Sequence, residues 1–231
     1  MARRRVDGKA IPMSDTVLPA AGRWHQRWQE TCGWLALPPV LWPVGERLLA
    51  RYQEPTRHYH GPGHILALLS HLDNFVGVVR NHDAVEIAIW FHDAIYDPTA
   101  SGDQNERHSA HLFHRELGDV LRGQLSSDTV ETLILATRHE DTRPASSDES
   151  LIRDLDLSVL AEPSARYLTY TEDISREYSH LDETTFREGR TQFIKKFLSR
   201  KQIYKTRHFR KLWEDQAREN LVEELDSLTG R

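Results

Sequence analysis

The sequence predicts an all-α protein, and three observations support this fold class. Apolar residues recur three, four and seven positions apart along nearly all of the chain after Ala21, which is the spacing of one helix face. No stretch shows the sustained apolar–polar alternation of a strand. Prolines and Gly-Pro turns separate the periodic stretches. A chain of 231 residues, 39% hydrophobic and 28% charged, fits one folded domain with a sizeable core.

Four helices are expected in the first part of the chain, over 24–35, 40–52, 64–72 and 83–95. The first stops before Pro38-Pro39, and the second ends near Pro55. Gly61-Pro62-Gly63 forms a turn that leads into the third. Asp97-Pro98 closes the fourth, because proline disfavours the helical conformation in the residue before it.

The rest of the chain is expected to add further helices. A polar loop over 99–103 precedes a fifth helix that runs through Leu117, and Ser126-Ser127 caps a sixth that reaches Thr137. A loop is expected over 141–148. The last four helices are expected over 151–160, 164–181, 184–199 and 207–228. Residues 1–20 are expected to form a flexible tail, and residues 21–231 a single domain.

Composition excludes several classes of protein. A net charge of −5 disfavours binding to extended nucleic acid. Cys32 is alone, so neither an internal disulfide nor a cysteine-based metal site is expected, and a cytoplasmic location is predicted. No run approaches the roughly 20 apolar residues that span a bilayer, so no membrane association is expected. Any metal ion must therefore be bound by histidine and carboxylate side chains.

The stretch from Ala88 to Asp97 places an imidazole and a carboxylate, His92-Asp93, at the end of an apolar run. His92 shares a helix face with apolar residues three, four and seven positions before it. A polar ring on a buried face needs a partner, because desolvating it unpaired is costly. Neighbouring residues leave a helix in different directions, yet both can reach one ion at its edge.

Possible ligands occur in three further places beside apolar stripes, at His64, His139 and Asp156. A hard or borderline divalent cation accepts this mixture of imidazole nitrogen and carboxylate oxygen. An all-α protein has to collect such ligands from several helices. Each residue alone is weak support, because a lone histidine on an apolar face is more often a hydrogen-bonded core residue.

The order of these residues adds weight, because longer motifs accompany them. The motifs are Arg57-His58-Tyr59-His60-x-x-x-His64-Ile65, Trp90-Phe91-His92-Asp93-Ala94-Ile95-Tyr96-Asp97, Asn105-Glu106-x-x-Ser109-Ala110, Ala136-Thr137-x-His139, Asp154-Leu155-Asp156-Leu157-x-x-Leu160, Arg176-Glu177-Tyr178 and Gly189-Arg190. The chain resembles the HD-domain superfamily of metal-dependent phosphohydrolases, and within it the predicted family with "YHxxxHI" and "FHDxxYD" signatures. The resemblance covers roughly 24–225.

The resemblance implies an HD-type helical bundle with additional C-terminal helices. It implies that the metal ligands are His64, His92, Asp93 and Asp156, with Asp154 in a structural role. One divalent ion per chain is expected, of Mn, Mg, Ni, Co, Zn or Fe. A second ion remains an alternative, since HD proteins with two metals use extra histidines in the region of His139.

Two acidic residues are candidates for handling protons, and each has a simpler interpretation. Asp97 follows His92 closely, but it also precedes Pro98 and would form a turn. HD enzymes that remove pyrophosphate carry a Glu-Asp pair here, whereas this chain has Tyr96 in place of the glutamate. Glu106 stands near a helix start, where a negative charge is stabilising in any case.

Three residues are candidates for contacting substrate: Arg57, His60 and His139. Arg57 is suited to a bidentate phosphate contact, with a surface or ion-paired arginine as the alternative. His60 is expected to face the cleft and to bind phosphate or orient water. Arg176 or Arg190 could close over substrate, but helical Arg-Glu pairing, with Glu177 among the acids, is the commoner explanation.

The resulting hypothesis is a metal-dependent phosphohydrolase that acts on a small phosphoester, with nucleotides and cyclic nucleotides among the candidates. Two alternatives stay open: a non-catalytic protein that senses a nucleotide, and a two-iron oxygenase on the same scaffold. A small molecule is the expected partner, and a homodimer is left open.

Overall fold

The computed structural model describes residues 20–75, 79–121, 125–138 and 145–230, and within these ranges the protein is all-α with no strand. The helices are α1 (Ala20–Trp34), α2 (Val44–Tyr52), α3 (Pro62–Asn74), α4 (His82–Phe91), α5 (Gln104–Phe113), α6 (Ser127–Ala136), α7 (Ser147–Asp156), α8 (Ser164–Glu177), α9 (Glu183–Leu198) and α10 (Arg207–Thr229). Short η segments occur at Pro39–Leu41 (η1), His114–Gly118 (η2, a π turn) and Leu157–Ala161 (η3). The predicted all-α class is confirmed, and the HD-type bundle stays a prediction. Residues 1–19 of the tail predicted over 1–20 lie outside the described ranges, and Ala20 begins α1.

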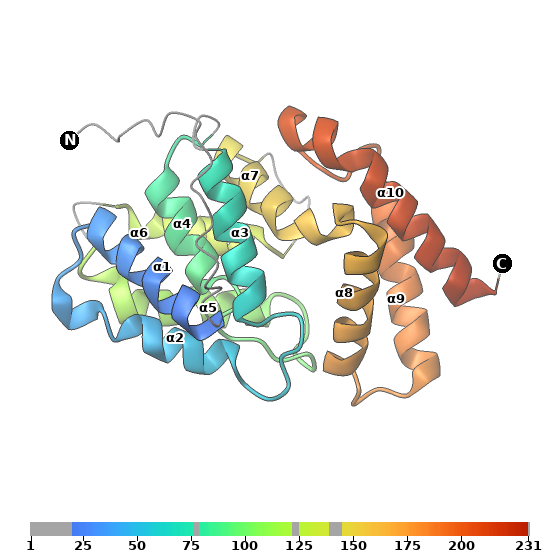
Figure 1. Ribbon diagram of the computed structural model, residues 1–231, viewed down its shortest axis with the longest axis horizontal. Coiled ribbons are helices and arrows are strands. Elements are labelled where there is room, and N and C mark those ends of the chain that lie inside the picture. The colour runs from blue at the N-terminus through green and yellow to red at the C-terminus, as the bar shows by residue number, and fades with distance from the viewer. Residues whose placement is uncertain (1–19, 76–78, 122–124, 139–144, 231) are drawn as a thin grey trace.

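Helices α1–α7 form one bundle, and α8–α10 stand beside it as a second group (Figure 1). The 3-10 segment η3 connects α7 of the bundle to α8 and also packs against α10. The two groups therefore meet near the C-terminal end of α7. None of the helices within the described ranges is both long and apolar enough to cross a membrane.

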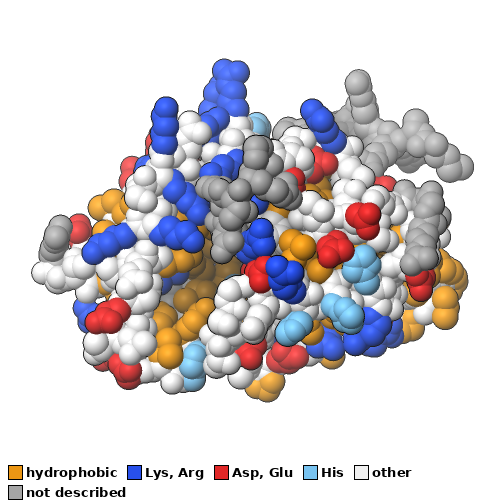
Figure 2. All heavy atoms as spheres, turned by 180° about the vertical axis from the view of Figure 1, so that it is seen from behind, with side chains coloured by type: hydrophobic (Ala, Val, Ile, Leu, Met, Phe, Trp, Pro, Cys, Tyr) orange, Lys and Arg blue, Asp and Glu red, His pale blue; other side chains and the backbone are white. Residues whose placement is uncertain are grey.

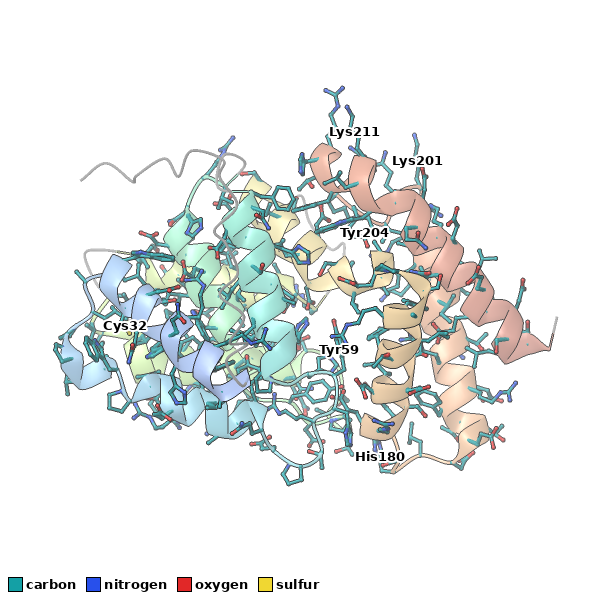
Figure 3. All side chains as sticks on the ribbon, in the orientation of Figure 1. Cys32, Tyr59, His180, Lys201, Tyr204 and Lys211 are labelled. Carbon is teal, nitrogen blue, oxygen red and sulfur yellow. The ribbon has the colours of Figure 1, made fainter. Side chains whose placement is uncertain are left out.

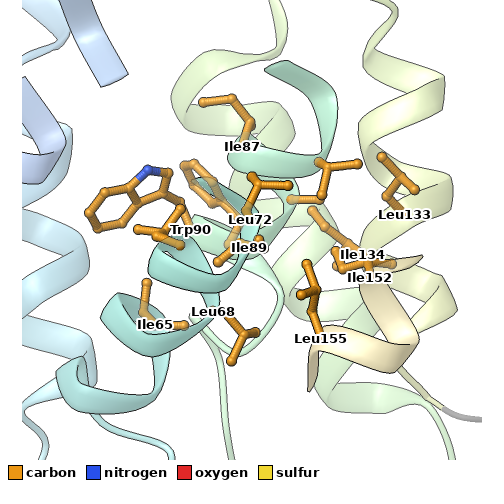
Figure 4. Packing of buried hydrophobic residues seen from close by; sticks show 14 of the residues in the cluster. Ile65, Leu68, Leu72, Ile87, Ile89, Trp90, Leu133, Ile134, Ile152 and Leu155 are labelled. Carbon is orange, nitrogen blue, oxygen red and sulfur yellow. The ribbon is translucent and has the colours of Figure 1, made fainter. Parts of the chain in front are cut away.

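Helix α4 is the centre of the bundle, since all its residues except Asp83 are buried. It packs against α3, α5, α6 and α7. Figure 4 shows the interlocked side chains; those labelled are Ile65, Leu68, Leu72, Ile87, Ile89, Trp90, Leu133, Ile134, Ile152 and Leu155. Burial of each leucine or isoleucine contributes about 1.5–3 kcal/mol. This packing fixes the end of α4, where the His92-Asp93 pair begins.

The predicted end of the fourth helix was wrong. The prediction continued to residue 95, but α4 ends at Phe91 and His92 is its C-cap. Tertiary hydrogen bonds replace the helical ones: the hydroxyl of Ser109 accepts from the backbone N–H of Ile95 at 3.0 Å and donates to its carbonyl at 3.2 Å. His92 still has helical dihedrals and donates its backbone N–H to the carbonyl of Ala88, so the chain leaves the helix only after it.

The second predicted helix, over 40–52, is also divided. The structure has η1 at Pro39–Leu41 and then α2 from Val44. Pro43 lies between them as the N-cap of α2. Proline has no N–H to donate to an earlier carbonyl, so a continuous helix through it is disfavoured.

The start of the seventh helix lies earlier than predicted. Residues 141–144 of the predicted loop lie outside the described ranges, but Ser147 and Asp148 already belong to α7. The cause is a capping box, in which Ser146 accepts from the backbone of Glu149 and Glu149 accepts from the backbone of Ser146. The helix then ends at Asp156, and the predicted remainder to residue 160 is the tighter η3.

Asp154 joins the two helical groups. This residue is fully buried, and its two carboxylate oxygens accept the backbone N–H groups of Lys205 and Thr206 at 2.7 Å each. Thr206 is the N-cap of α10, so the carboxylate fixes the start of that helix against α7. The structural role expected for Asp154 is confirmed.

Candidate metal centre

Four side chains from three helices converge where the bundle meets the C-terminal helices. His64 lies in the first turn of α3, because the N-cap Gly61 and Pro62 start that helix immediately before it. His92 and Asp93 follow the last residue of α4, and Asp156 is the last residue of α7. We call these four residues the His–Asp group.

The ligand atoms of the His–Asp group lie close together. Nε2 of His64 is 3.3 Å from Nε2 of His92 and 3.1 Å from Oδ1 of Asp156. Nε2 of His92 is 3.1 Å from Oδ2 of Asp93 and 3.4 Å from Oδ1 of Asp156. All four ligand atoms lie within 4.8 Å of one another. His64, His92, Asp93 and Asp156 therefore lie close together, as the sequence predicted.

These spacings fit a shared cation. Two ligands that each lie about 2.1 Å from one ion are roughly 3.0 Å apart at a right angle and roughly 3.4 Å apart at the tetrahedral angle. The distances within the His–Asp group, from 3.1 to 3.6 Å, lie around those values. Two imidazoles and two carboxylates are also a suitable donor set for a divalent metal. The group can hold a metal ion.

The orientation of His92 supports this assignment. Its Nδ1 donates to the carbonyl of Ile89 at 2.9 Å, within the last turn of α4. This hydrogen bond places a proton on Nδ1 and directs Nε2 at the other three ligand atoms. A backbone carbonyl behind the imidazole is the usual arrangement that orients a metal-binding histidine.

Burial and charge act in opposite directions on the pKa values of the His–Asp group. Burial lowers the pKa of His64 below 6.5. Burial also disfavours charge on His92, but Asp93 and Asp156 raise its pKa well above 6.5. Burial disfavours charge on Asp93 too, yet the adjacent imidazole of His92 lowers the pKa of this carboxyl. Asp93 therefore stays ionised, and the group favours positive charge at its centre.

Arg57 closes the end of α4 from which the ligands project. The last carbonyls of a helix lack intrahelical partners, and a cation beside them is stabilising. Nη1 of Arg57 donates to the carbonyl of Asp93 at 2.5 Å, and Nη2 donates to the carbonyl of Ala94 at 3.2 Å. Its Nε pairs with Glu54 at 3.1 Å. The predicted phosphate contact of Arg57 stays a prediction. In the structure, its hydrogen bonds hold the turn formed by Asp93 and Ala94 in place.

His60 is held by a carboxylate from the C-terminal helices. Its Nδ1 hydrogen-bonds Oε2 of Glu177 at 2.6 Å, and its ring stacks on Tyr96 with the ring centroids 4.1 Å apart. The other oxygen of Glu177 accepts the backbone N–H groups of His58, Tyr59 and His60 at 2.7–2.8 Å. Burial opposes a charge on His60, but the bond to Glu177 raises its pKa above 6.5. Nε2 of His60 remains available to the adjoining cavity.

The interpretation of Glu177 as a member of an ordinary helical ion pair was therefore wrong. Arg176 pairs with Asp173 at 3.2 Å, whereas Glu177 is buried and bonds a loop of the bundle. Arg190 is likewise buried, and it pairs with Glu224 of α10 rather than within its own helix. These contacts join elements far apart in the sequence, which is why local spacing missed them.

The two candidate proton-handling residues are placed differently. Asp97 is exposed, and its Oδ1 accepts the backbone N–H of Thr99 at 2.8 Å and the hydroxyl of Thr99 at 2.7 Å. It forms the turn that its position before Pro98 suggested. Glu106, in the first turn of α5, lies among the residues that line the cavity beside Asp93.

His139 lies outside the described residues, so its predicted place in the pocket is not described. His108 and His111 are exposed, and His114 pairs with Glu131 at 2.8 Å. In the part of the chain that the structure describes, the His–Asp group is the one set of histidine and acidic residues close enough to hold an ion.

A cavity of about 580 Å³ lies beside the His–Asp group, and both Asp93 and Asp156 contribute to its lining. The cavity lies between the bundle and the helices α8 and α9, at the position where Tyr59 is labelled in Figure 3. Figure 2, from the opposite side, shows a hollow between the two helical groups with hydrophobic side chains inside it. The volume is within the roughly 300–1,000 Å³ typical of small-molecule sites.

Comparisons of the chain with family models, with curated proteins and with solved structures returned no match. Membership of the HD superfamily thus stays a prediction, supported by the motifs and by the meeting of His64, His92, Asp93 and Asp156.

Proposed function

We propose that the protein is a metal-dependent phosphohydrolase of the HD type that acts on a small phosphoester, with nucleotides as the leading candidates. The observation that carries this proposal is the convergence of the His–Asp group beside a cavity of small-molecule size. The order of its ligands supports the HD assignment: a histidine from α3, a His-Asp pair after α4 and an aspartate at the end of α7.

One divalent ion would be held by His64, His92, Asp93 and Asp156. Such an ion lowers the pKa of a bound water from about 15.7 towards 7 and withdraws charge from a phosphoryl oxygen. The contribution of the chain is to fix the ligands. The Nδ1–H of His92 is bonded to Ile89, and the turn that carries Asp93 is clamped by Arg57.

Two cavity-lining residues supply the other functions that hydrolysis needs. His60 lines the cavity and is held through Nδ1 by Glu177, which leaves Nε2 as the ring nitrogen that donates to a phosphoryl oxygen. Glu106 lines the same cavity and is the residue that takes a proton from the attacking water. Asp97 keeps a turn with Thr99 and is assigned no proton transfer.

Neither alternative has a comparable observation in its favour. A two-iron oxygenase needs further ligands, and no second ligand set accompanies the His–Asp group among the described residues. A non-catalytic sensor would not need the full set of four ligands around one point. The binding experiment below distinguishes the sensor from the enzyme.

The test uses the full chain, stripped of metal and reloaded in turn with Mn²⁺, Co²⁺, Ni²⁺, Zn²⁺, Fe²⁺ and Mg²⁺. Bound metal is counted by elemental analysis, and turnover is measured on a panel of phosphomonoesters and phosphodiesters. We expect one ion per chain and hydrolysis of at least one class of ester. Tight nucleotide binding with every metal but no turnover would support the sensor instead.

A matched pair of variants ties the activity to the His–Asp group. His64→Gln removes one ligand, and His111→Gln replaces an exposed histidine of α5. We expect the first to abolish metal retention and hydrolysis, and the second to leave both unchanged. Equal metal retention in the two variants would contradict the assigned ligand set.

A further inference from the structure

The cavity beside the His–Asp group has two unlike walls. The bundle contributes charged and polar groups, among them Asp93, Asp156 and His60. Helices α8 and α9 contribute mainly apolar and aromatic side chains, including Tyr170, Phe186 and Phe193. A phosphate at the ion would occupy the polar end only, so the cavity has room for the organic group of the ester along the second wall.

Gly189 lies on that second wall, inside helix α9. Glycine in the interior of a helix is disfavoured by about 1 kcal/mol relative to alanine, so its presence asks for a reason. Its φ is not in the left-handed region, unlike those of Gly102 and Gly230. The backbone conformation therefore does not require a glycine at this position.

Packing against protein atoms does not require it either. A Cβ built at Gly45 would lie 2.3 Å from the Trp28 ring, so close packing explains that glycine. A Cβ built at Gly189 meets no atom within 4 Å. Gly189 is an exposed residue that also lines the cavity, so a longer side chain there would extend along the cavity opening.

The aromatic side chains around this space indicate what would occupy it. Tyr170 and Tyr178 of the α8 side and Phe186 and Phe193 of α9 line the same cavity. Planar heterocycles stack on such rings, and each stacked base is worth about 1–3 kcal/mol. The guanidinium of Arg190, next to Gly189, pairs with Glu224 and lies over the Tyr170 and Phe193 rings, 5.1 and 4.8 Å from their centroids. The rings left for an incoming heterocycle on this wall are therefore chiefly those of Tyr178 and Phe186.

We propose that the α8–α9 wall sets substrate selectivity by accepting a planar aromatic ring attached to the phosphate, and that Gly189 keeps the space for this ring open. The inference rests on the proposed function, because the phosphate end of the substrate is assigned to the His–Asp group. The ring belongs either to a nucleoside phosphate or to a simpler aryl phosphate, and the test separates these two sources.

The test compares the metal-loaded wild type with Gly189→Leu, Gly189→Ala and the control Gln192→Leu. Gln192 is an exposed residue of α9 outside the cavity lining, so the control adds the same side chain elsewhere on the helix. The substrates are a nucleoside monophosphate, phenyl phosphate and glycerol phosphate. The quantity compared is kcat/KM for each ester.

We expect Gly189→Leu to lower kcat/KM for the ring-bearing esters by about 10- to 200-fold and to change it little for glycerol phosphate. Gly189→Ala should give a smaller loss in the same direction, and Gln192→Leu none. A loss on the nucleoside ester that exceeds the loss on phenyl phosphate identifies the nucleoside as the ligand. Equal losses on all three esters, or no loss on any, would overturn the inference.

A binding measurement separates failure of this inference from failure of the proposed function. Calorimetric titration of the metal-loaded protein with a nucleoside monophosphate needs no turnover. Weaker binding in Gly189→Leu than in Gln192→Leu, without hydrolysis by the wild type, supports the ring site and rejects the enzyme. If the wild type hydrolyses esters with selectivity that Gly189→Leu does not change, the enzyme stands and the ring site falls.

A second variant covers the case in which Gly189→Leu does not fold, as judged by circular dichroism. Phe186→Ala removes a ring from the same wall at a partly buried position. We expect it to lower the preference for ring-bearing esters over glycerol phosphate several-fold. An unchanged preference in Phe186→Ala would overturn the inference in that case.

Discussion

The two walls of the cavity are built on different principles. On the bundle wall, each charged side chain has fixed polar partners: His92 bonds Ile89, and the Asp93 turn is bonded by Arg57. The α8–α9 wall consists mainly of aromatic and aliphatic side chains, with the ion pair of Arg190 and Glu224 among them. The difference suggests that the bundle determines the reaction, whereas α8 and α9 determine which molecule enters.

The largest effects should come from replacing Asp154 and Asp156, which lie two residues apart at the end of α7, by asparagine one at a time. Asp156→Asn removes a ligand and should weaken metal binding by at least about 100-fold while leaving metal-free stability nearly unchanged. Asp154→Asn should do the reverse and lower the free energy of unfolding by roughly 2–3 kcal/mol, since it loses two charge-assisted bonds to α10. Metal titration and urea unfolding measure the two effects.

If both variants lost metal equally and were equally destabilised, the division between a ligand and a structural carboxylate would be wrong. The roles of Asp154 and Asp156 would then have to be reassigned, because the structure distinguishes Asp154 by its bonds to the backbone of Lys205 and Thr206.

The next effect concerns the acidic residue on the polar wall. Glu106→Gln should lower kcat by about 100-fold, the usual contribution of a general base. Asp97→Asn should change kcat less than about threefold, since the turn that it forms lies outside the cavity lining. Steady-state kinetics on the best ester decides between them. A larger loss in the Asp97 variant would return the proton-transfer role to Asp97.

A smaller effect is expected at the junction between the walls. Glu177→Gln keeps the shape of the side chain but removes the charge that holds Nδ1 of His60, so kcat/KM should fall by roughly tenfold. The loss should appear with every ester, because His60 belongs to the phosphate end. Asp173→Asn, a change at a nearby exposed ion pair of α8, is the control. A loss confined to ring-bearing esters would mean that Glu177 acts on the α8–α9 wall and not at the phosphate end.

The same pair makes a prediction for stability against pH. The pKa of His60 is raised from 6.5, so its contribution is complete below that pH and is lost as the pH rises through the raised value. The pKa of Glu177 is lowered from 4.5, so its contribution is complete above that pH and is lost on acidification. The difference in unfolding free energy between wild type and Glu177→Gln should therefore be largest between pH 4.5 and 6.5. A difference that does not vary with pH would contradict the pairing.

The smallest effect should be a gain. Gly189→Ala adds a methyl group into open space inside a helix, so it should stabilise the fold by about 1 kcal/mol and raise Tm by about 2–4 °C. Thermal unfolding of the metal-free protein measures this shift. A variant that is both more stable and less active on ring-bearing esters would sharpen the contrast between the walls; a destabilised one would mean that the helix needs the glycine for packing.

Local patterns in the sequence predicted most of the helices, because apolar spacing is a short-range feature; the spacing around α4, for example, predicted its burial. Apolar stripes gave His64, His92-Asp93, His139 and Asp156 as possible ligands, and the resemblance to the HD superfamily selected the four residues that the structure brings together. The end of α4 could not be predicted, since Ser109 and Arg57 supply the hydrogen bonds that replace helix there. Those partners are distant in the sequence and leave no periodic signal.

The second wall could be predicted least. Glu177 and His60 meet across the two helical groups, and nothing in their own neighbourhoods in the sequence indicates a partner. In the sequence, Gly189 stands out only as part of a motif with Arg190. The open space beside it exists only in the folded chain. Contacts between separate helical groups require coordinates, whereas the amphipathic stripe of one helix does not.

The carboxylate of Glu177 also determines whether the bundle can be separated from helices α8–α10. A single side chain from α8 satisfies three consecutive backbone N–H groups of the loop before α3. A shortened protein that stops before α8 would leave these donors without their acceptor and His60 without its anchor. The bundle is therefore not a transferable module: grafting it onto another C-terminal segment would carry over the His–Asp group but not the complete cavity beside it.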